Sequence, residues 1–211
     1  MAAATVVWEL PMRVWHWALA ACVTGSLYTG LAGDITLMEC HQQFGYGVLG
    51  LLLFRLGWGL WGGRYARFGN YRLEPRRVVA HFRGRDHGAP HTAPGMAFTV
   101  FILLALAVQV VTGLFATDDI FTEGPLSGRV EDDTARALTG VHHRVYWLIL
   151  AGLAAHLTAH AVYALRRDPM PLAMITGRKR LAMEPARPAS MAALLTAAAA
   201  AALVWLLLEL A

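Results

Sequence analysis

The sequence predicts an all-α integral membrane protein, in which a four-helix transmembrane bundle is followed by a fifth, C-terminal transmembrane helix. Of its 211 residues, 57% are hydrophobic and only 15% are charged, whereas about 25% of the residues of a soluble domain are charged. Five apolar stretches have about the length of 20 residues that a helix needs to cross a bilayer. Histidines lie in these stretches, where ionisable groups are costly and usually mark a functional site.

The apolar stretches divide the chain into a core and an appended helix. They cover residues 14–32, 44–61, 96–116, 145–165 and 189–210. We expect the four core helices to span about residues 14–32, 42–62, 95–116 and 141–165. The fifth stretch is rich in alanine, has no histidine and follows Pro185 and Pro188. The expected division is therefore a core at 1–180 and a linker with the C-terminal helix at 181–211.

Charges between the stretches predict the orientation in the membrane. Arginine and lysine are concentrated at 62–94 and 166–188, whereas acids dominate 33–43 and 117–136. Basic connections stay on the cytoplasmic side of a membrane. We therefore expect a multi-pass protein of the bacterial inner membrane, with a cytoplasmic N-terminus and a periplasmic C-terminus. The basic clusters are explained by topology and contact with membrane lipid, so we expect no nucleic-acid partner.

Four histidines fall at two depths. His142 and His156 are 14 residues apart, which places them within about 40° of one helix face and about 21 Å apart along it. His41, at the outer start of the second stretch, shares the outer depth with His142. His16, near the cytoplasmic end of the first stretch, shares the inner depth with His156.

Paired imidazoles across a helix bundle suit the two axial positions of a six-coordinate haem b. Arg55 lies 14 residues after His41, so it shares a face with that histidine at the inner depth, where it would bind a haem propionate or extend to the interface. Two alternatives remain for the ligands. His160 is one turn beyond His156 and could replace it, and His143 neighbours His142 but points about 100° away.

Five motifs follow one another along the chain: "VWELPMRVWHW", "CHQQFGYGVLGLLLFRLGWGLWG", "TGLFATDD", "VHHRVYWLILAGLAAH" and "AMITGRKR". In this order they resemble the bacterial di-haem b-type cytochromes of the cytochrome b561 and Ni,Fe-hydrogenase cytochrome b group. The resemblance covers nearly all of residues 5–180. It implies two haems b held by His16 with His156 and by His41 with His142. His143 stands where that family often has a carboxylate, and "HGAPHTAPG" is a loose version of its His-Asn-Pro loop, which leaves the role of His91 open.

The resemblance also implies electron transfer between quinone or quinol in the membrane and a periplasmic redox protein, such as a c-type cytochrome, a hydrogenase or another oxidoreductase. The acidic outer loops would attract a basic partner. A second reading is a superoxide oxidase that reduces quinone, which would need a cationic outer face. A third is a histidine-lined metal-ion permease without haem.

Overall fold

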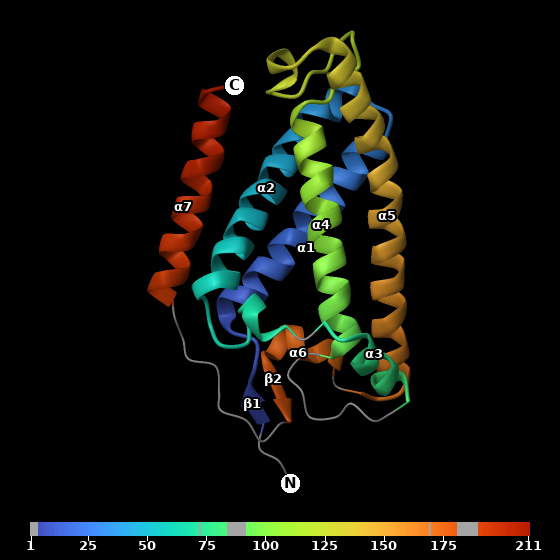
Figure 1. Ribbon diagram of the computed structural model, residues 1–211, viewed down its shortest axis with the longest axis vertical. Helices are drawn as coiled ribbons and strands as arrows, with labels where there is room; N and C mark the ends of the chain where they lie inside the picture. Colours follow the sequence, from blue (N-terminus) through green and yellow to red (C-terminus); the bar gives the residue numbers. More distant parts are fainter. Residues whose placement is uncertain (1–3, 72, 84–91, 169, 181–189) are drawn as a thin grey trace.

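Five long helices run side by side along the length of the molecule (Figure 1). The computed structural model describes residues 4–71, 73–83, 92–168, 170–180 and 190–211. The long helices are α1 (Leu10–Leu31), α2 (Met38–Trp61), α4 (Ala93–Leu114), α5 (Asp132–Leu165) and α7 (Ser190–Glu209). Of these, α1 packs on α2, α4 on α5, and α7 on α2.

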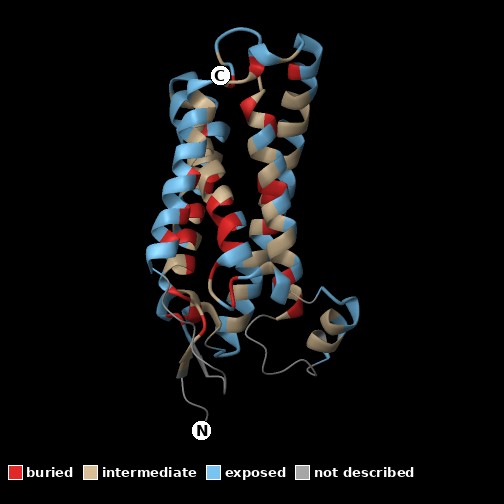
Figure 2. Ribbon diagram, turned by 60° about the vertical axis from the view of Figure 1, so that its left-hand side comes forward, coloured by how far each residue is buried: buried red, intermediate tan, exposed pale blue. Residues whose placement is uncertain are grey.

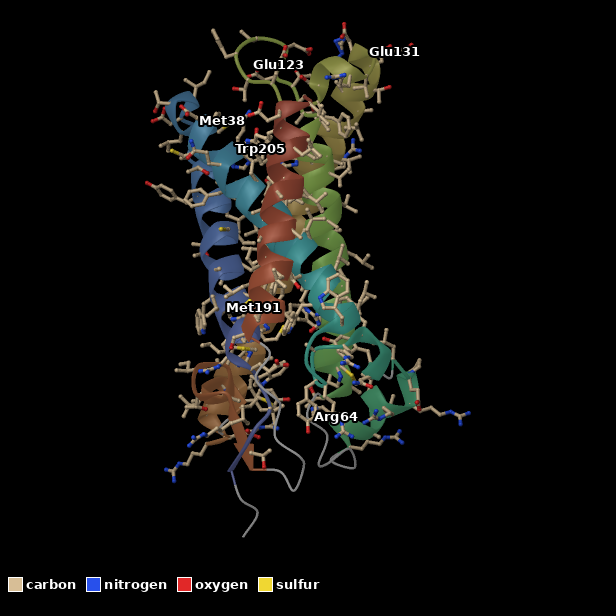
Figure 3. The ribbon with its side chains drawn as sticks, turned by 90° about the vertical axis from the view of Figure 1, so that its left-hand side faces the viewer. Met38, Arg64, Glu123, Glu131, Met191 and Trp205 are labelled. Atoms are coloured by element: carbon tan, nitrogen blue, oxygen red, sulfur yellow. The ribbon has the colours of Figure 1, made fainter. Side chains whose placement is uncertain are left out.

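Short elements close the two ends of the bundle. At one end, β1 (Ala4–Val6) pairs antiparallel with β2 (Arg178–Arg180), next to α3 (Pro75–Phe82) and α6 (Met170–Thr176). We call this the basic end, and Arg64 lies there in Figure 3. The opposite, acidic end carries the connection after α1 and residues 115–131, with Glu123 and Glu131 labelled in Figure 3. Single 3₁₀ turns lie at Ile35–Leu37, Phe68–Asn70 and Ser127–Arg129.

The helix starts follow from local chemistry. α1, α3 and α4 each have proline in the first turn, where its missing N–H costs nothing and its fixed φ suits a helix. The Thr92 hydroxyl accepts a hydrogen bond from Gly95 N at 3.2 Å and so caps α4. After α1, Gly33 takes a positive φ of 68° and turns the chain toward α2.

Several helices begin well before the predicted spans: α1 at Leu10, α2 at Met38 and α5 at Asp132. α2 begins at Met38, so His41 lies inside the helix. α5 is one continuous helix of 34 residues, so His142 and His156 are on the same rigid element.

Four of the long helices are long and apolar enough to cross a membrane. They are Ile35–Trp61, Ala93–Leu114, Asp132–Leu165 and Ser190–Glu209. α1 has the length of 22 residues but is more polar, with Arg13, His16, Ser26 and Thr29 in its sequence. Large apolar side chains point outward from the spanning helices, including Leu104, Leu157 and Leu203, which are 55–66% exposed. Such outward faces suit lipid contact.

Buried residues lie on the helix faces toward the interior of the bundle, whereas exposed residues lie on the outside (Figure 2). Trp15, Leu52, Leu106 and Ile149 belong to one continuous hydrophobic core. This core fills the bundle between the two depths of the histidines and joins the α1–α2 and α4–α5 pairs.

The fifth helix packs on α2 through small residues. Ala193, Thr196 and Ala200 are its buried residues, spaced three and four apart as one face of a helix requires. Trp61 Nε1 donates to the Thr196 hydroxyl at 3.0 Å. At the acidic end, Arg129 donates to the carbonyl oxygens of Leu210 and Ala211. α7 is therefore tied to the bundle at two heights.

Candidate functional site

The four predicted histidines form two facing pairs. In the outer pair, toward the acidic end, the ring centroids of His41 and His142 are 6.2 Å apart. In the inner pair, toward the basic end, the centroids of His16 and His156 are 6.4 Å apart. Two imidazoles on opposite sides of one metal ion, each with a metal–nitrogen bond of about 2.0 Å, have ring centres about 6.3 Å apart. Both pairs therefore have the spacing of two axial ligands.

Backbone carbonyls orient both imidazoles of the outer pair. His41 Nδ1 donates to Ser26 O at 2.9 Å, and His142 Nδ1 donates to Gln109 O, also at 2.9 Å. A carbonyl can only accept, so Nδ1 carries the proton and Nε2 keeps its lone pair. This is the arrangement that holds a histidine in the right tautomer and orientation for ligating a metal.

The same tripeptide supports each outer histidine. Thr29-Gly30-Leu31 on α1 lies against His41, and Thr112-Gly113-Leu114 on α4 lies against His142. Each threonine hydroxyl is 3.4 Å from the imidazole Nδ1, and a Cβ on either glycine would come within 2.9 Å of the ring. Sequence reasoning missed these residues, although the repeated "TGL" was a usable signal.

The side chain of Gln109 occupies the position that a metal would take on His142. Its Nε2 lies 3.1 Å from His142 Nε2, and its Oε1 is buried with no hydrogen-bond partner among the described residues. If His142 ligates iron, the Gln109 amide must turn away, because the iron and the amide would both use the lone pair of His142 Nε2.

A cavity of about 490 Å³ opens beside the outer pair. His41, His142 and Gly45 are among its lining residues, which come from α1, α2, α4, α5 and the acidic-end loops. Ligand sites in proteins typically have volumes of about 300–1,000 Å³ and mostly apolar walls. The outer pair thus has room for a large, flat ligand beside it.

The inner pair is packed differently. The His156 ring stacks on Phe98, with centroids 5.2 Å apart and an angle of 11° between the planes. His160 meets His156 edge-on at 4.4 Å, so it stays close enough to be the alternative ligand. His16 Nδ1 is buried with no hydrogen-bond partner among the residues described.

Arg55 lies buried near the inner pair and is only 1% exposed. Its Nη2 donates to the Tyr71 hydroxyl at 3.0 Å, and its guanidinium lies over the rings of Phe68 and Trp15. Nε and Nη1 have no hydrogen-bond partner in the described part of the chain. Buried charges require pairing, so the unpartnered donors leave this guanidinium able to bind an anion such as a haem propionate.

The remaining histidines are not members of the two facing pairs. His143 is exposed, and its centroid is 6.2 Å from that of His142. His81 Nε2 is 3.3 Å from the Tyr163 hydroxyl. His91 lies outside the described residues.

A rigid loop at residues 117–124 borders the outer cavity. Asp118 Oδ1 accepts hydrogen bonds from the backbone N–H groups of Ile120, Phe121 and Thr122 at 2.8–2.9 Å. These bonds stabilise the charged form and lower the pKa of Asp118 to about 2. Ile120 and Phe121 are held at the tip of the loop, 74% and 77% exposed.

Comparison with known proteins identifies the family. No curated protein and no solved structure matches the chain. The family model described as prokaryotic cytochrome b561 matches residues 7–177, a segment that contains both histidine pairs, Arg55 and the TGL repeats. The chain therefore belongs to the prokaryotic cytochrome b561 family of membrane electron-transfer proteins, and haem b is its cofactor.

Proposed function

We propose that this protein carries electrons through two haems b between the membrane quinone pool and a redox protein at the acidic end. The observation that carries the proposal is the presence of two facing histidine pairs at ligand spacing, at two depths of one bundle. Their partners on α5, His142 and His156, lie about 21 Å apart along the helix axis. Two redox centres at these depths divide the crossing of the membrane into shorter steps.

Each haem, when bound, supplies a one-electron redox centre whose potential depends on its ligands and surroundings. Residues of the chain orient the ligands, place a cation nearby and exclude water. The carbonyls of Ser26 and Gln109 fix the orientation of the outer imidazoles. Arg55 places a buried cation near the inner pair, where it binds a propionate and favours the reduced state. The apolar core between the pairs excludes water.

The most direct test is to count haem b per chain in detergent-purified protein, followed by a redox titration. We expect two haems and two midpoint potentials. Replacing His41 or His142 with alanine should remove the same haem, and replacing His16 or His156 should remove the other. A single haem, or loss of both haems from each variant, would contradict the pairing.

We further propose that α1 crosses the membrane with the other four long helices and that the basic end is cytoplasmic. α1 runs beside α2 from the basic end to the acidic end (Figure 1), and the charge distribution follows the positive-inside rule. Cys40 is exposed at the acidic end. In a Cys22→Ser background, a membrane-impermeant maleimide should label Cys40 in intact spheroplasts. Labelling only after lysis would reverse the orientation.

The loop 117–124 is the proposed docking surface for the electron-transfer partner. Its apolar tip, Ile120 and Phe121, is flanked by Asp119 and Glu123, and the loop lines the cavity of the outer pair. An exposed apolar patch flanked by acidic side chains suits a basic protein, such as a c-type cytochrome, with an apolar surface around its cofactor. Phe121→Ser should slow electron transfer to a basic mitochondrial cytochrome c probe without changing haem content, whereas Leu210→Ser, at another exposed acidic-end site outside the cavity, should not.

The charges at the acidic end disfavour the superoxide oxidase reading. Arg136 is paired with Asp119 at 3.5 Å and with Asp133 at 3.8 Å. Arg129 is bound to the carbonyls at the end of α7. These two cations are thus engaged, and the carboxylates beside Arg136 repel an anionic substrate. The third candidate cation, Arg144, is exposed on α5.

A further inference from the structure

A buried carboxyl group lies at the basic end, below the inner histidine pair. Glu9 is 5% exposed, and neither carboxyl oxygen has a hydrogen-bond partner among the described residues. It is the N-cap residue of α1, yet its side chain makes no capping bond. A carboxylate in such a place is costly unless something compensates its charge.

Glycine makes room for this carboxyl group. The position of a Cβ on Gly63 would overlap with Glu9 Oε1, so a larger residue at position 63 would displace the side chain. The backbone just before Glu9 is also fixed, since Val7 N and Trp8 N both donate to Gly177 O next to β2. The Glu9 carboxyl is therefore held in place although it has no hydrogen bond to any described residue.

The charged and titratable groups on these elements are mostly cationic. They are Arg13 on α1, Arg64, Tyr65 and Arg67 after α2, and Arg178 on β2. Arg13 Nη1 donates to Ile175 O at 2.6 Å, and Arg67 Nε donates to Gly62 O at 2.8 Å, so both are bound to backbone carbonyls. Burial raises the pKa of Glu9, and the charge of Arg67 opposes this increase only in part.

Glu9 also lies at a fixed distance along α1 from His16 of the inner pair. His16 follows it by seven residues, which places the two residues on one face of α1, within about 20° and about 10.5 Å apart along the helix axis. No aqueous layer separates them, because Met12 and Trp15 between them are buried. Charges at these two positions therefore interact through a low-dielectric region.

Building on the two-haem function proposed above, we propose that Glu9 binds its proton more tightly, and so takes up protons from the basic-end solution, when one electron reaches the metal held by the inner histidine pair. The electron comes from a quinol or another reductant and reduces the ferric iron to the ferrous state. The proton converts the Glu9 carboxylate to the neutral acid, so the charge added by the electron is balanced. Glu9 thereby couples the redox state of the inner haem to pH.

The size of the effect follows from the separation. One added negative charge at a distance on the order of 10 Å, in an effective dielectric of about 20, raises the proton affinity of a carboxylate by roughly tenfold. By reciprocity, the proton changes the electron affinity by the same factor. For a one-electron couple a tenfold ratio corresponds to about 59 mV. The inner midpoint potential should therefore fall by about this amount in total as pH rises through the titration of Glu9.

The test is a redox titration of the purified two-haem protein from about pH 5 to about pH 9, a range that includes the pKa values of buried glutamates. The inner potential is the one that His156→Ala removes. In Glu9→Gln it should be independent of pH, equal to the native value at acidic pH and higher at alkaline pH, because the amide mimics the neutral acid. Glu74→Gln is the matched control, since Glu74 is exposed at the same end, and should keep the native pH dependence.

A second measurement avoids mutation. The redox infrared difference spectrum of the native protein should gain the carbonyl band of a protonated carboxylic acid on reduction, and this band should shift in D₂O. A pH-independent inner potential in the native protein, or an unchanged pH dependence in Glu9→Gln, would overturn the proposal. Either result with two haems present would leave the electron-transfer function intact, whereas absence of haem would refute that function instead.

Discussion

Gly113→Ala should weaken haem binding at the outer pair by crowding His142. The added Cβ would lie 2.9 Å from His142 Cε1, whereas ordinary contact begins at 3.4 Å. The ring must therefore move by about 0.5 Å, the difference between these distances. Its hydrogen bond to Gln109 O is 2.9 Å long, and the same movement would lengthen it to about 3.4 Å, beyond the normal range.

The expected loss follows from that bond. A hydrogen bond of this kind contributes about 1 kcal/mol net, which corresponds to roughly fivefold weaker haem binding. Loss of a group that orients a metal-bound histidine can reach about 100-fold. We therefore expect a decrease of at least about fivefold at the outer site and none at the inner site.

The assay is titration of haem into haem-free protein, combined with the haem content of protein purified from cells. Gly30→Ala should have the same effect through His41, because the contact distances nearly match. Gly50→Ala is the matched control, since its Cβ would meet only Val204 Cγ2 at 3.7 Å. If Gly113→Ala bound the outer haem as tightly as Gly50→Ala, the tight fit at His142 would not support ligation.

Three further predictions concern the inner ligand, the buried arginine and the acidic loop. His160→Ala should keep both haems and His156→Ala should lose the inner one; the reverse result in haem counts would move the ligand by one turn. Arg55→Leu should lower the inner midpoint potential in a redox titration, since removing a nearby cation disfavours the reduced state; unchanged potentials would exclude contact with a propionate. The contribution of Asp118 to loop order should be present above the ordinary pKa of an aspartate, near 3.8, and be lost as pH falls through about 2. Hydrogen exchange of residues 120–122 should therefore show protection at neutral pH that Asp118→Asn reduces, and equal protection in both proteins would refute the role of this carboxylate.

The sequence predicted the helices and the depth of the histidines because both depend on local pattern. Apolar length determines a span, and residue number along a helix determines depth. The supporting contacts were not predictable in this way. The contacts of His142 with Gln109 O and Thr112 depend on how α4 packs on α5, and this packing cannot be read from a local sequence pattern. The buried state of Glu9 was equally hidden, because it depends on Gly63 and on strands of three residues that carry little sequence signal.

The buried state of Arg55 shows the same limit. Its spacing from His41 placed it at the inner depth, but spacing alone left two positions open, interfacial or buried. Packing against Phe68 and Tyr71, which follow α2 by several residues, decides between them. A loop outside the apolar stretch thus determines the environment of a charge within it.

The continuous helix α5 carries one histidine from each pair. If these histidines hold two haems as proposed, the helix fixes the distance that an electron must travel between them. Inserting one residue between His142 and His156 would rotate one imidazole by about 100° and lose its partner, whereas inserting seven would restore the face within about 20° and add about 10.5 Å. An insertion between His142 and His156 can thus keep both histidines facing their partners only if it adds close to a whole number of helical turns. Because electron tunnelling slows exponentially with distance, the proposed transfer rate would depend on how many residues of α5 separate His142 from His156.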